Sequence, residues 1–393
     1  MDSPLSKRVQ RVKPSPTIAV TARAAEMRAA GKDIIGLSAG EPDFDTPAHI
    51  KQAGIDAIRA GHTKYTAVDG TPDLKQAIIA KLRRDNDLDY TAREILVSAG
   101  AKHSIYNLMA AVLDDGDEVV IPAPYWVSYP DMTKLFDAVP VIVETHQHNR
   151  FKMTPDQLDA ALTDRSKLLM INSPCNPTGT VYTKADLLAL GEVLQAYPRV
   201  LVMTDDIYEH IIWADEPFSN LVNACPSLRD RTMVVNGVSK GYAMTGWRIG
   251  YAAGPEAIIS AMKKVQSQST SNPCTIAQTA ATAALQGDQS CIGPMREAYR
   301  ERHDYVVAAL NAMPGVDALA GLGTFYSFPN VEGAIRKLGL ADDVALAEYL
   351  INEAQVALVP GSAFGMGGHL RVSFATSMCT LEKAMQRLHA ALA

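Results

Sequence analysis

Short apolar runs alternate with helical patterns through the middle of this chain of 393 residues. The runs are continuously apolar, which is typical of strands buried on both faces, and helix-period segments such as 184–196 lie between several of them. The predicted strands are residues 94–98, 117–122, 139–144, 167–172, 200–204, 232–236 and 248–253. This alternation predicts an α/β fold with a mostly parallel sheet that helices cover on both faces.

The pattern changes after about Gly287. A long, charged helical pattern at 293–311 is followed by further helical patterns at 344–353 and 381–392 and by short apolar runs at 325–328, 356–359 and 370–374. We therefore expect a smaller α+β domain, which the loop-rich N-terminal segment joins. The predicted large domain is residues 47–290, and the predicted small domain is residues 1–46 with 291–393.

Composition excludes several classes of protein. Hydrophobic residues make up 47% and charged residues 20%, which favours a globular protein with a large core. The net charge of -6 argues against nucleic acid as a partner. No apolar stretch is long enough to span a membrane, and the N-terminus has no apolar core of a secretory signal.

Scattered cysteines predict free thiols in a reducing compartment, and we expect a cytoplasmic protein. His146 and His148 form the only close histidine pair, and no cysteine lies nearby, so we expect no metal site. The cysteines are Cys175, Cys225, Cys274, Cys291 and Cys379.

Lys240 follows the predicted strand 232–236 and lies among small residues. A lysine in that setting can be desolvated and can act as a nucleophile. Arg248 offers a second cation nearby. Pyridoxal phosphate (PLP) requires both, an amine for its aldehyde and a guanidinium for its phosphate. A single lysine is more often a solvated surface charge, so this prediction depends on other segments.

Two further strand ends offer parts for the same cofactor. Asp205 follows the strand 200–204 and can keep a pyridine nitrogen protonated, and Tyr208 is close enough along the chain to reach the ring oxygen. Asn176 lies in a loop that prolines and a glycine restrict. Taken singly, Asp205 is more simply a helix cap and Asn176 part of an ordinary turn.

A fourth strand end supplies a turn of small residues at Gly100 and Ala101, where a helix begins whose backbone N–H groups can bind phosphate. Trp126 follows another strand and can stack on the cofactor ring, although a lone tryptophan is more often a core residue. Because ligands of such sheets bind beyond the carboxyl ends of the strands, these segments together are more specific than any one alone.

From about Ser6 to its C-terminus the chain closely resembles the fold type I, class I aminotransferases, which use PLP. Within them it is most similar to the bacterial aspartate aminotransferase branch, whose members often also accept prephenate. The motifs that carry the resemblance are GEPDF at 40–44, YWVSYP at 125–130, NPTG at 176–179, Asp205 with Tyr208, and the segment from Ser239 and Lys240 to Arg248.

The resemblance implies a role for each of these residues toward the cofactor. Lys240 forms the covalent link to its aldehyde and then moves the proton at the substrate Cα. Asp205 pairs with the ring nitrogen, Tyr208 and Asn176 hydrogen-bond the ring oxygen, and Trp126 stacks on the ring. The phosphate is held by Gly100, Ala101, Ser239 and Arg248.

Tyr65 matches the tyrosine that the family lends to the neighbouring subunit's phosphate, which implies a homodimer with shared active sites. One position departs from the family: where many members carry a hydroxyl residue for the phosphate, this chain has Gly237.

The resemblance also locates the substrate, which borders Asn176 and Trp126. Arg371 matches the arginine that binds the α-carboxylate, for which a guanidinium is well suited, and Gly40 matches a backbone position beside it. Lys102 and Thr17 match the pair that binds a second carboxylate in this branch. We therefore expect aspartate as amino donor and 2-oxoglutarate as acceptor, with conversion of prephenate to arogenate as an accompanying activity.

Two alternatives stay open, and a third is not expected. The same fold serves aminotransferases of other donors, such as glutamate, alanine or aromatic amino acids. PLP-dependent lyases share the lysine and the aspartate and divert the same chemistry to elimination. A ligand-sensing regulator would carry a DNA-binding module ahead of this domain, for which no room exists before the motif at 40–44.

Overall fold

A computed structural model describes residues 4–14 and 16–393. Residues 1–3 and 15, which fall in the predicted small domain, lie outside the described residues.

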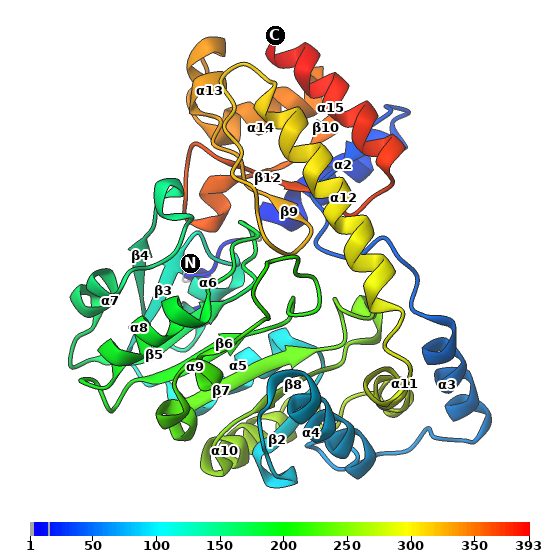
Figure 1. Ribbon diagram of the computed structural model, residues 1–393, viewed down its shortest axis with the longest axis vertical. Helices are drawn as coiled ribbons and strands as arrows, with labels where there is room; N and C mark the ends of the chain where they lie inside the picture. The colour runs from blue at the N-terminus through cyan, green and yellow to red at the C-terminus, as the bar shows by residue number, and fades with distance from the viewer. Residues whose placement is uncertain (1–3, 15) are drawn as a thin grey trace.

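A seven-stranded sheet forms the centre of the larger part of the molecule (Figure 1). Its order is β2-β8-β7-β6-β5-β3-β4, and neighbouring strands are parallel except that β8 is antiparallel to both β2 and β7. The mostly parallel sheet is thus confirmed. The strands are β2 (Ile95–Ser98), β3 (Glu118–Ala123), β4 (Val139–Glu144), β5 (Ser166–Asn172), β6 (Leu201–Asp205), β7 (Thr232–Gly237) and β8 (Gly250–Ala253).

Successive residues of the central strands bury their side chains on opposite faces of the sheet. In β5, Leu168 and Met170 pack with residues of α5, α6 and α10, whereas Leu169 and Ile171 pack with residues of α7 and α8. Both faces are therefore apolar, which explains the unbroken hydrophobic runs. The helices of this part are α3 (Ala48–Arg59), α4 (Pro72–Asn86), α5 (Ala101–Val112), α6 (Ser128–Leu135), α7 (Pro155–Ala161), α8 (Lys184–Leu194), α9 (Leu221–Ala224), α10 (Glu256–Ser267) and α11 (Thr275–Gln286).

Polar caps set where several of these helices begin. Thr71 accepts a hydrogen bond from the Leu74 N–H at the start of α4, and Pro72 occupies the first helical position. Thr154 and Thr183 form capping boxes at α7 and α8. These local signals fix the helix starts between the strands.

The first helix, α1 (Lys7–Gln10), contacts α6 of the larger part, whereas the other remaining helices and two smaller sheets lie together at the other end of the molecule, where α2 runs beside the C-terminal elements (Figure 1). β1 (Ile35–Gly36) pairs with β10 (Val356–Ala357), so the N-terminal segment joins the C-terminal part. The division into domains at 47 and 290 stays a prediction that this pairing supports. The elements of this end are α2 (Pro16–Ala29), α12 (Ile292–Asn311), α13 (Glu332–Leu338), α14 (Asp343–Glu353), α15 (Met378–Leu392) and, in the order β11-β12-β9, β11 (Val359–Pro360), β12 (Leu370–Ser373) and β9 (Tyr326–Ser327).

Two predicted strands are wrong in detail. The run at 356–359 is two strands, because β10 pairs with β1 whereas β11 pairs with β12 in the other small sheet. The run at 248–253 begins later, at Gly250, because Arg248 has a left-handed backbone with φ 56 after a short 3-10 helix, Thr245–Trp247. None of the helices in residues 4–14 and 16–393 has the length and apolarity of a membrane span.

Candidate active site

A cavity of about 300 Å³ opens at the carboxyl ends of β5 and β6, between the large sheet and the small sheet of β9 and β12. It brings together side chains from segments that are far apart in the sequence. Most of the predicted site residues line it: Thr17, Gly40, Ala101, Lys102, Trp126, Asn176, Asp205, Tyr208, Ser239, Lys240, Arg248 and Arg371.

Lys240 lies just beyond β7, and its ammonium donates a hydrogen bond to the Gly40 carbonyl. Burial lowers the pKa of Lys240 to about 8, and the charges of Arg371 and Arg248 act in the same direction. A substantial share of this amine is therefore neutral near pH 7.5, and only the neutral amine can attack a carbonyl carbon.

Asp205, the last residue of β6, is 5% exposed and faces the cavity. Burial raises its pKa to about 6. Hydrogen bonds from the Tyr129 hydroxyl, at 2.6 Å, and from the Ile207 N–H act in the opposite direction and limit this rise. When ionised, a buried carboxylate of this kind stabilises a cationic ring that binds beside it. The contact of Tyr129 with Asp205 was not predicted from the sequence, because Tyr129 lies within a motif without any separate signal for this contact.

Asn176 and Tyr208 border the same space from two different loops. The Asn176 N–H donates to Asn172 Oδ1 at 2.8 Å, which holds the loop after β5 in place. The Tyr208 hydroxyl lies 3.1 Å from the Tyr326 hydroxyl. Tyr326 also lines the cavity, and the sequence pattern contained no signal for it, because it lies in an ordinary apolar run.

The N-terminus of α5 forms one end of the cavity, together with Arg248. Gly100 has a positive φ of 91, and a Cβ at this position would clash with the Arg248 guanidinium, so the missing side chain lets the arginine approach. Arg248 Nη1 donates to the Thr245 carbonyl at 2.9 Å. A helix N-terminus beside a guanidinium is a site for a phosphate group. The Gly100 N–H itself donates to the Ser98 carbonyl.

Gly237 has a steric explanation. A Cβ at this position would stand 3.0 Å from the Gly250 Cα and 3.0 Å from the Ile249 carbonyl oxygen, because β7 and β8 pair there with glycine opposite glycine. A hydroxyl residue here would press its Cβ against the β8 backbone. A phosphate at this end of the cavity must therefore be bound without a side-chain hydroxyl from position 237.

Arg371, on β12, is 2% exposed and lies at the other end of the cavity. Its Nη1 donates to Asn176 Oδ1 at 3.0 Å and its Nη2 to the Ser38 carbonyl at 2.7 Å. Its buried Nε has no partner in the described part of the chain. An unsatisfied guanidinium nitrogen beside an open cavity is suited to bind a carboxylate.

Lys102 and Thr17 lie on the outer side of this cavity. Lys102 Nζ lies 4.7 Å from the centre of the Trp126 ring, and partial burial and the Arg248 charge lower the pKa of Lys102. The buried Thr17 hydroxyl finds no hydrogen-bond partner among residues 4–14 and 16–393. Both groups are free to bind a second acceptor group on a ligand.

Comparison with known proteins identifies the family. Residues 32–388 match aminotransferase class I and II. The chain belongs to this family. It is 56% identical over 390 residues to the aspartate/prephenate aminotransferase of Nitrosomonas europaea, with 98% of both chains covered.

Solved aminotransferases share the whole fold. The aspartate aminotransferase of Rhizobium meliloti superposes with a TM-score of 0.95 at 45% identity, covering 99% of both chains. The aspartate aminotransferase of Thermus thermophilus with maleate gives 0.94 at 43% identity, covering 99% of this chain and 100% of that one. The aminotransferase fold predicted from the resemblance is confirmed.

Membership of the aminotransferase family implies PLP as the cofactor and amino acids with 2-oxo acids as substrates. The residues present fit that cofactor. An amine of lowered pKa, a buried carboxyl and a cationic end for phosphate surround one cavity, at Lys240, Asp205 and Arg248.

Two predicted residues do not line the cavity. Gly100 lies behind Arg248, where its missing side chain makes room for the guanidinium. Tyr65 is 92% exposed on a loop away from the cavity, so its role toward a neighbouring subunit stays a prediction.

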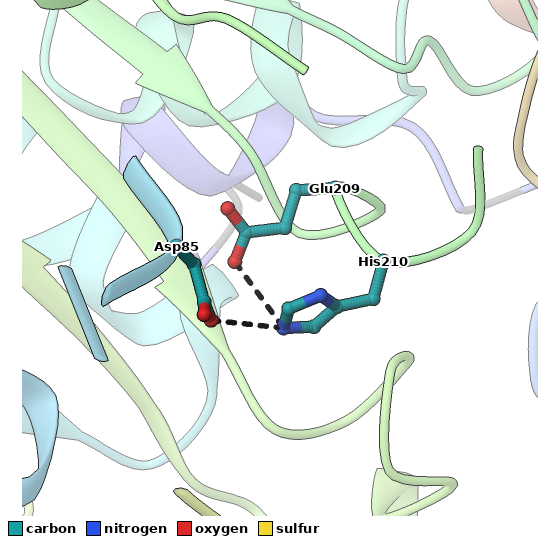
Figure 2. A group of neighbouring side chains, drawn as sticks. All are labelled: Asp85, Glu209 and His210. Carbon is teal, nitrogen blue, oxygen red and sulfur yellow. Dashed lines mark ion pairs between the residues drawn. The ribbon is translucent and has the colours of Figure 1, made fainter. Parts of the chain in front are cut away.

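A second group of ionisable side chains lies behind the aminotransferase site. Asp85, Glu209 and His210 bring their polar atoms within 4.8 Å of one another (Figure 2). Lys81 makes a buried ion pair with Glu209 and lies 3.9 Å from Asp85, so this group already contains its own cation. Sequence analysis missed it because α4 is far from the loop after β6 along the chain. His210 packs against Gly241, next to Lys240.

Proposed function

We propose that this protein is a PLP-dependent aminotransferase that moves the amino group of aspartate to 2-oxoglutarate, giving oxaloacetate and glutamate, and that also converts prephenate to arogenate. The observation that carries the proposal is the single cavity between Lys240, Asp205 and Arg371. The name of the Nitrosomonas europaea relative supports both substrates.

PLP, when bound, supplies an electron sink that stabilises negative charge at the Cα of an amino acid. Lys240 would hold the cofactor and then, once released as a neutral amine, would move the proton from the substrate Cα to the cofactor carbon that carries the nitrogen. Asp205 holds a proton at the ring nitrogen. Tyr208 and Asn176 donate to the ring oxygen, and Trp126 covers the ring. The phosphate is held by Ala101, Ser239 and Arg248, with Gly100 providing the space.

Substrate binding follows from the two ends of the cavity. Arg371, which keeps one guanidinium nitrogen unpaired, binds the α-carboxylate, and Gly40 lines the same cavity. Lys102 and Thr17 bind the distal carboxylate of aspartate or the second carboxylate of prephenate. The Thermus thermophilus structure contains maleate, which is itself a dicarboxylate, and this supports a site for two carboxylates.

We also propose that the protein is a cytoplasmic homodimer in which Tyr65 binds the phosphate in the neighbouring active site. The exposed position of Tyr65 leaves it available for that contact. Mixing Lys240→Ala protein with Tyr65→Ala protein tests this, because only a mixed dimer contains one intact shared site. Activity that does not rise on mixing and subunit exchange contradicts shared sites.

The substrate assignment is tested with a panel of amino donors against 2-oxoglutarate. A charge-assisted hydrogen bond contributes roughly 1.5–3 kcal/mol, so we expect Lys102→Ala to lose about 10- to 150-fold in kcat/KM for aspartate and much less for aromatic donors. The control is Lys264→Ala, an exposed lysine on α10. An equal loss for both classes of donor means that Lys102 serves the cofactor instead.

Two assays separate the remaining alternatives. Prephenate turnover no higher than that of Lys240→Ala removes the prephenate activity. Release of a 2-oxo acid without any acceptor indicates a lyase, the other enzyme that this site can form.

A further inference from the structure

Tyr326 contacts two groups that have separate tasks in the proposed reaction. It is 1% exposed and lies on β9, next to the strand that carries Arg371. Its hydroxyl is 3.1 Å from the Tyr208 hydroxyl, and the centre of its ring lies 4.5 Å from the Arg371 guanidinium carbon. One side chain thus joins a group that faces the cofactor to a group that faces the substrate.

The hydrogen bond between the two tyrosines has a preferred direction. One phenol donates and the other accepts, and the acceptor keeps its own proton for a third group. Burial raises the pKa of both hydroxyls, and the Arg371 cation, which lies against the Tyr326 ring, opposes that rise in both. The Asp205 charge further raises the pKa of Tyr208 only, so the Tyr326 hydroxyl is the better donor. Tyr208 then accepts, and its proton is free to point into the cavity.

The surroundings hold this arrangement in place. The rings of Tyr208 and Tyr326 meet edge to face, with centroids 6.0 Å apart at 76°. A Cβ on Gly40 would stand 3.1 Å from the Tyr326 oxygen, so the Gly40 backbone lies close to this hydroxyl. Neither tyrosine can turn away without breaking these contacts.

We infer that Tyr326 is a positioning residue: its hydroxyl donates to Tyr208, which leaves the Tyr208 proton for the ring oxygen of the cofactor, and its ring braces Arg371 for the substrate carboxylate. This inference rests on the proposed PLP-dependent function.

The first test is Tyr326→Phe, which removes only the hydroxyl. A hydrogen bond from Tyr208 disperses the negative charge of the ring oxygen and weakens its hold on the neighbouring proton. Without the Tyr326 hydroxyl, Tyr208 no longer accepts a hydrogen bond, and its own hydrogen bond to the ring oxygen becomes weaker. The pH midpoint of the cofactor's visible absorbance then rises by about half to one pH unit.

A double variant shows whether Tyr326 acts through Tyr208. We expect the double variant Tyr208→Phe with Tyr326→Phe to have the same pH midpoint of absorbance as Tyr208→Phe alone. Once the Tyr208 hydroxyl is absent, removal of the Tyr326 hydroxyl has no further effect on the ring oxygen. Tyr299→Phe is the control: it removes a hydroxyl that bonds Asp43, from an equally buried ring of the same core, and leaves the midpoint unchanged.

Tyr326→Met tests the ring. The methionine keeps a similar apolar volume but removes the ring that contacts Arg371. Loss of a cation–π contact of this kind should raise the KM for aspartate about 5- to 30-fold relative to Tyr326→Phe. Thermal melts compared with Tyr299→Phe check that both variants fold.

An unchanged midpoint in Tyr326→Phe overturns the inference about the hydroxyl, and additive shifts in the double variant show that Tyr326 does not act through Tyr208. Equal KM values for the Phe and Met variants overturn the inference about the ring. A wild-type protein that gains no titrating absorbance band with PLP contradicts the proposed function instead.

Discussion

Asp205 should make the cofactor-free protein less stable than it would be with an uncharged residue at this position. Its pKa is raised from 3.8 to about 6 by burial, which corresponds to roughly 3 kcal/mol against the ionised form. Between pH 4 and 6 the unfolded chain releases this proton while the folded chain keeps it. The free energy of unfolding therefore falls as pH rises to about 6, and the loss persists above it.

Asp205→Asn removes this penalty but leaves part of an amide donor unpaired beside the Tyr129 hydroxyl, at a cost of about 1 kcal/mol. We therefore expect the cofactor-free variant to be more stable than wild type by about 2 kcal/mol at pH 8 and by less than about 1 kcal/mol at pH 5.

Urea unfolding at both pH values, at one fixed protein concentration, measures the difference. Saturation with PLP reverses its sign, because the carboxylate then faces a cation. A difference that is the same at pH 5 and pH 8 refutes the argument, since a change in packing alone does not depend on protonation of Asp205.

Further predictions concern cofactor uptake. The rate at which cofactor-free protein takes up PLP rises with pH and levels off above about 8, the pKa of Lys240; stopped-flow absorbance that is flat from about pH 6 to 9 contradicts this. Gly100→Ala displaces Arg248 and weakens PLP binding about 10- to 100-fold in fluorescence titrations, while pyridoxal, which lacks the phosphate, binds as before. Tyr129→Phe removes the hydrogen bond to Asp205, which further raises the pKa of Asp205 and lowers PLP affinity several-fold by the same titration; equal affinity shows that the bond is not needed.

The large sheet was predictable because its strands appear as unbroken apolar runs. All of them are largely buried except the edge strand β4, which was predicted as buried but is partly exposed. Parallel strands bring their carboxyl ends to one edge, and this rule predicts from the sequence alone that Asp205, Asn176 and Lys240 lie together. The division of the run at 356–359 between two sheets was not predictable, since pairing with β1 or with β12 is decided by tertiary contacts.

Tyr129 and Tyr326 escaped sequence analysis for a related reason. Each is a nearly fully buried aromatic residue, and its pattern does not differ from that of a core residue. Only the position of the hydroxyl, against Asp205 or against Tyr208, marks a part in the site. The Lys81–Glu209 ion pair was missed in the same way, because α4 and the loop after β6 meet only in the folded chain.

The buried charges of this site act together. Burial shifts the pKa of Lys240 downward and that of Asp205 upward, so each shift favours the neutral form. Arg371 keeps an unsatisfied nitrogen beside them. In water these groups would be solvated. Here a ligand must satisfy them, with a carbonyl carbon for the neutral amine of Lys240, a cationic ring for the Asp205 carboxylate and a carboxylate for Arg371. Binding of PLP and a dicarboxylate satisfies all three, so the ligands should stabilise the fold most at the pH where Asp205 is ionised.

Glu209 lies behind these groups and stays ionised throughout. Its pKa is lowered to about 2 despite its burial, and the charge of Lys81 is the main cause. Glu209 follows Tyr208 directly in the sequence, so the Lys81–Glu209 ion pair anchors the loop that carries Tyr208. The ion pair therefore fixes the residue that follows Tyr208 by a contact that does not involve Lys240 or Asp205.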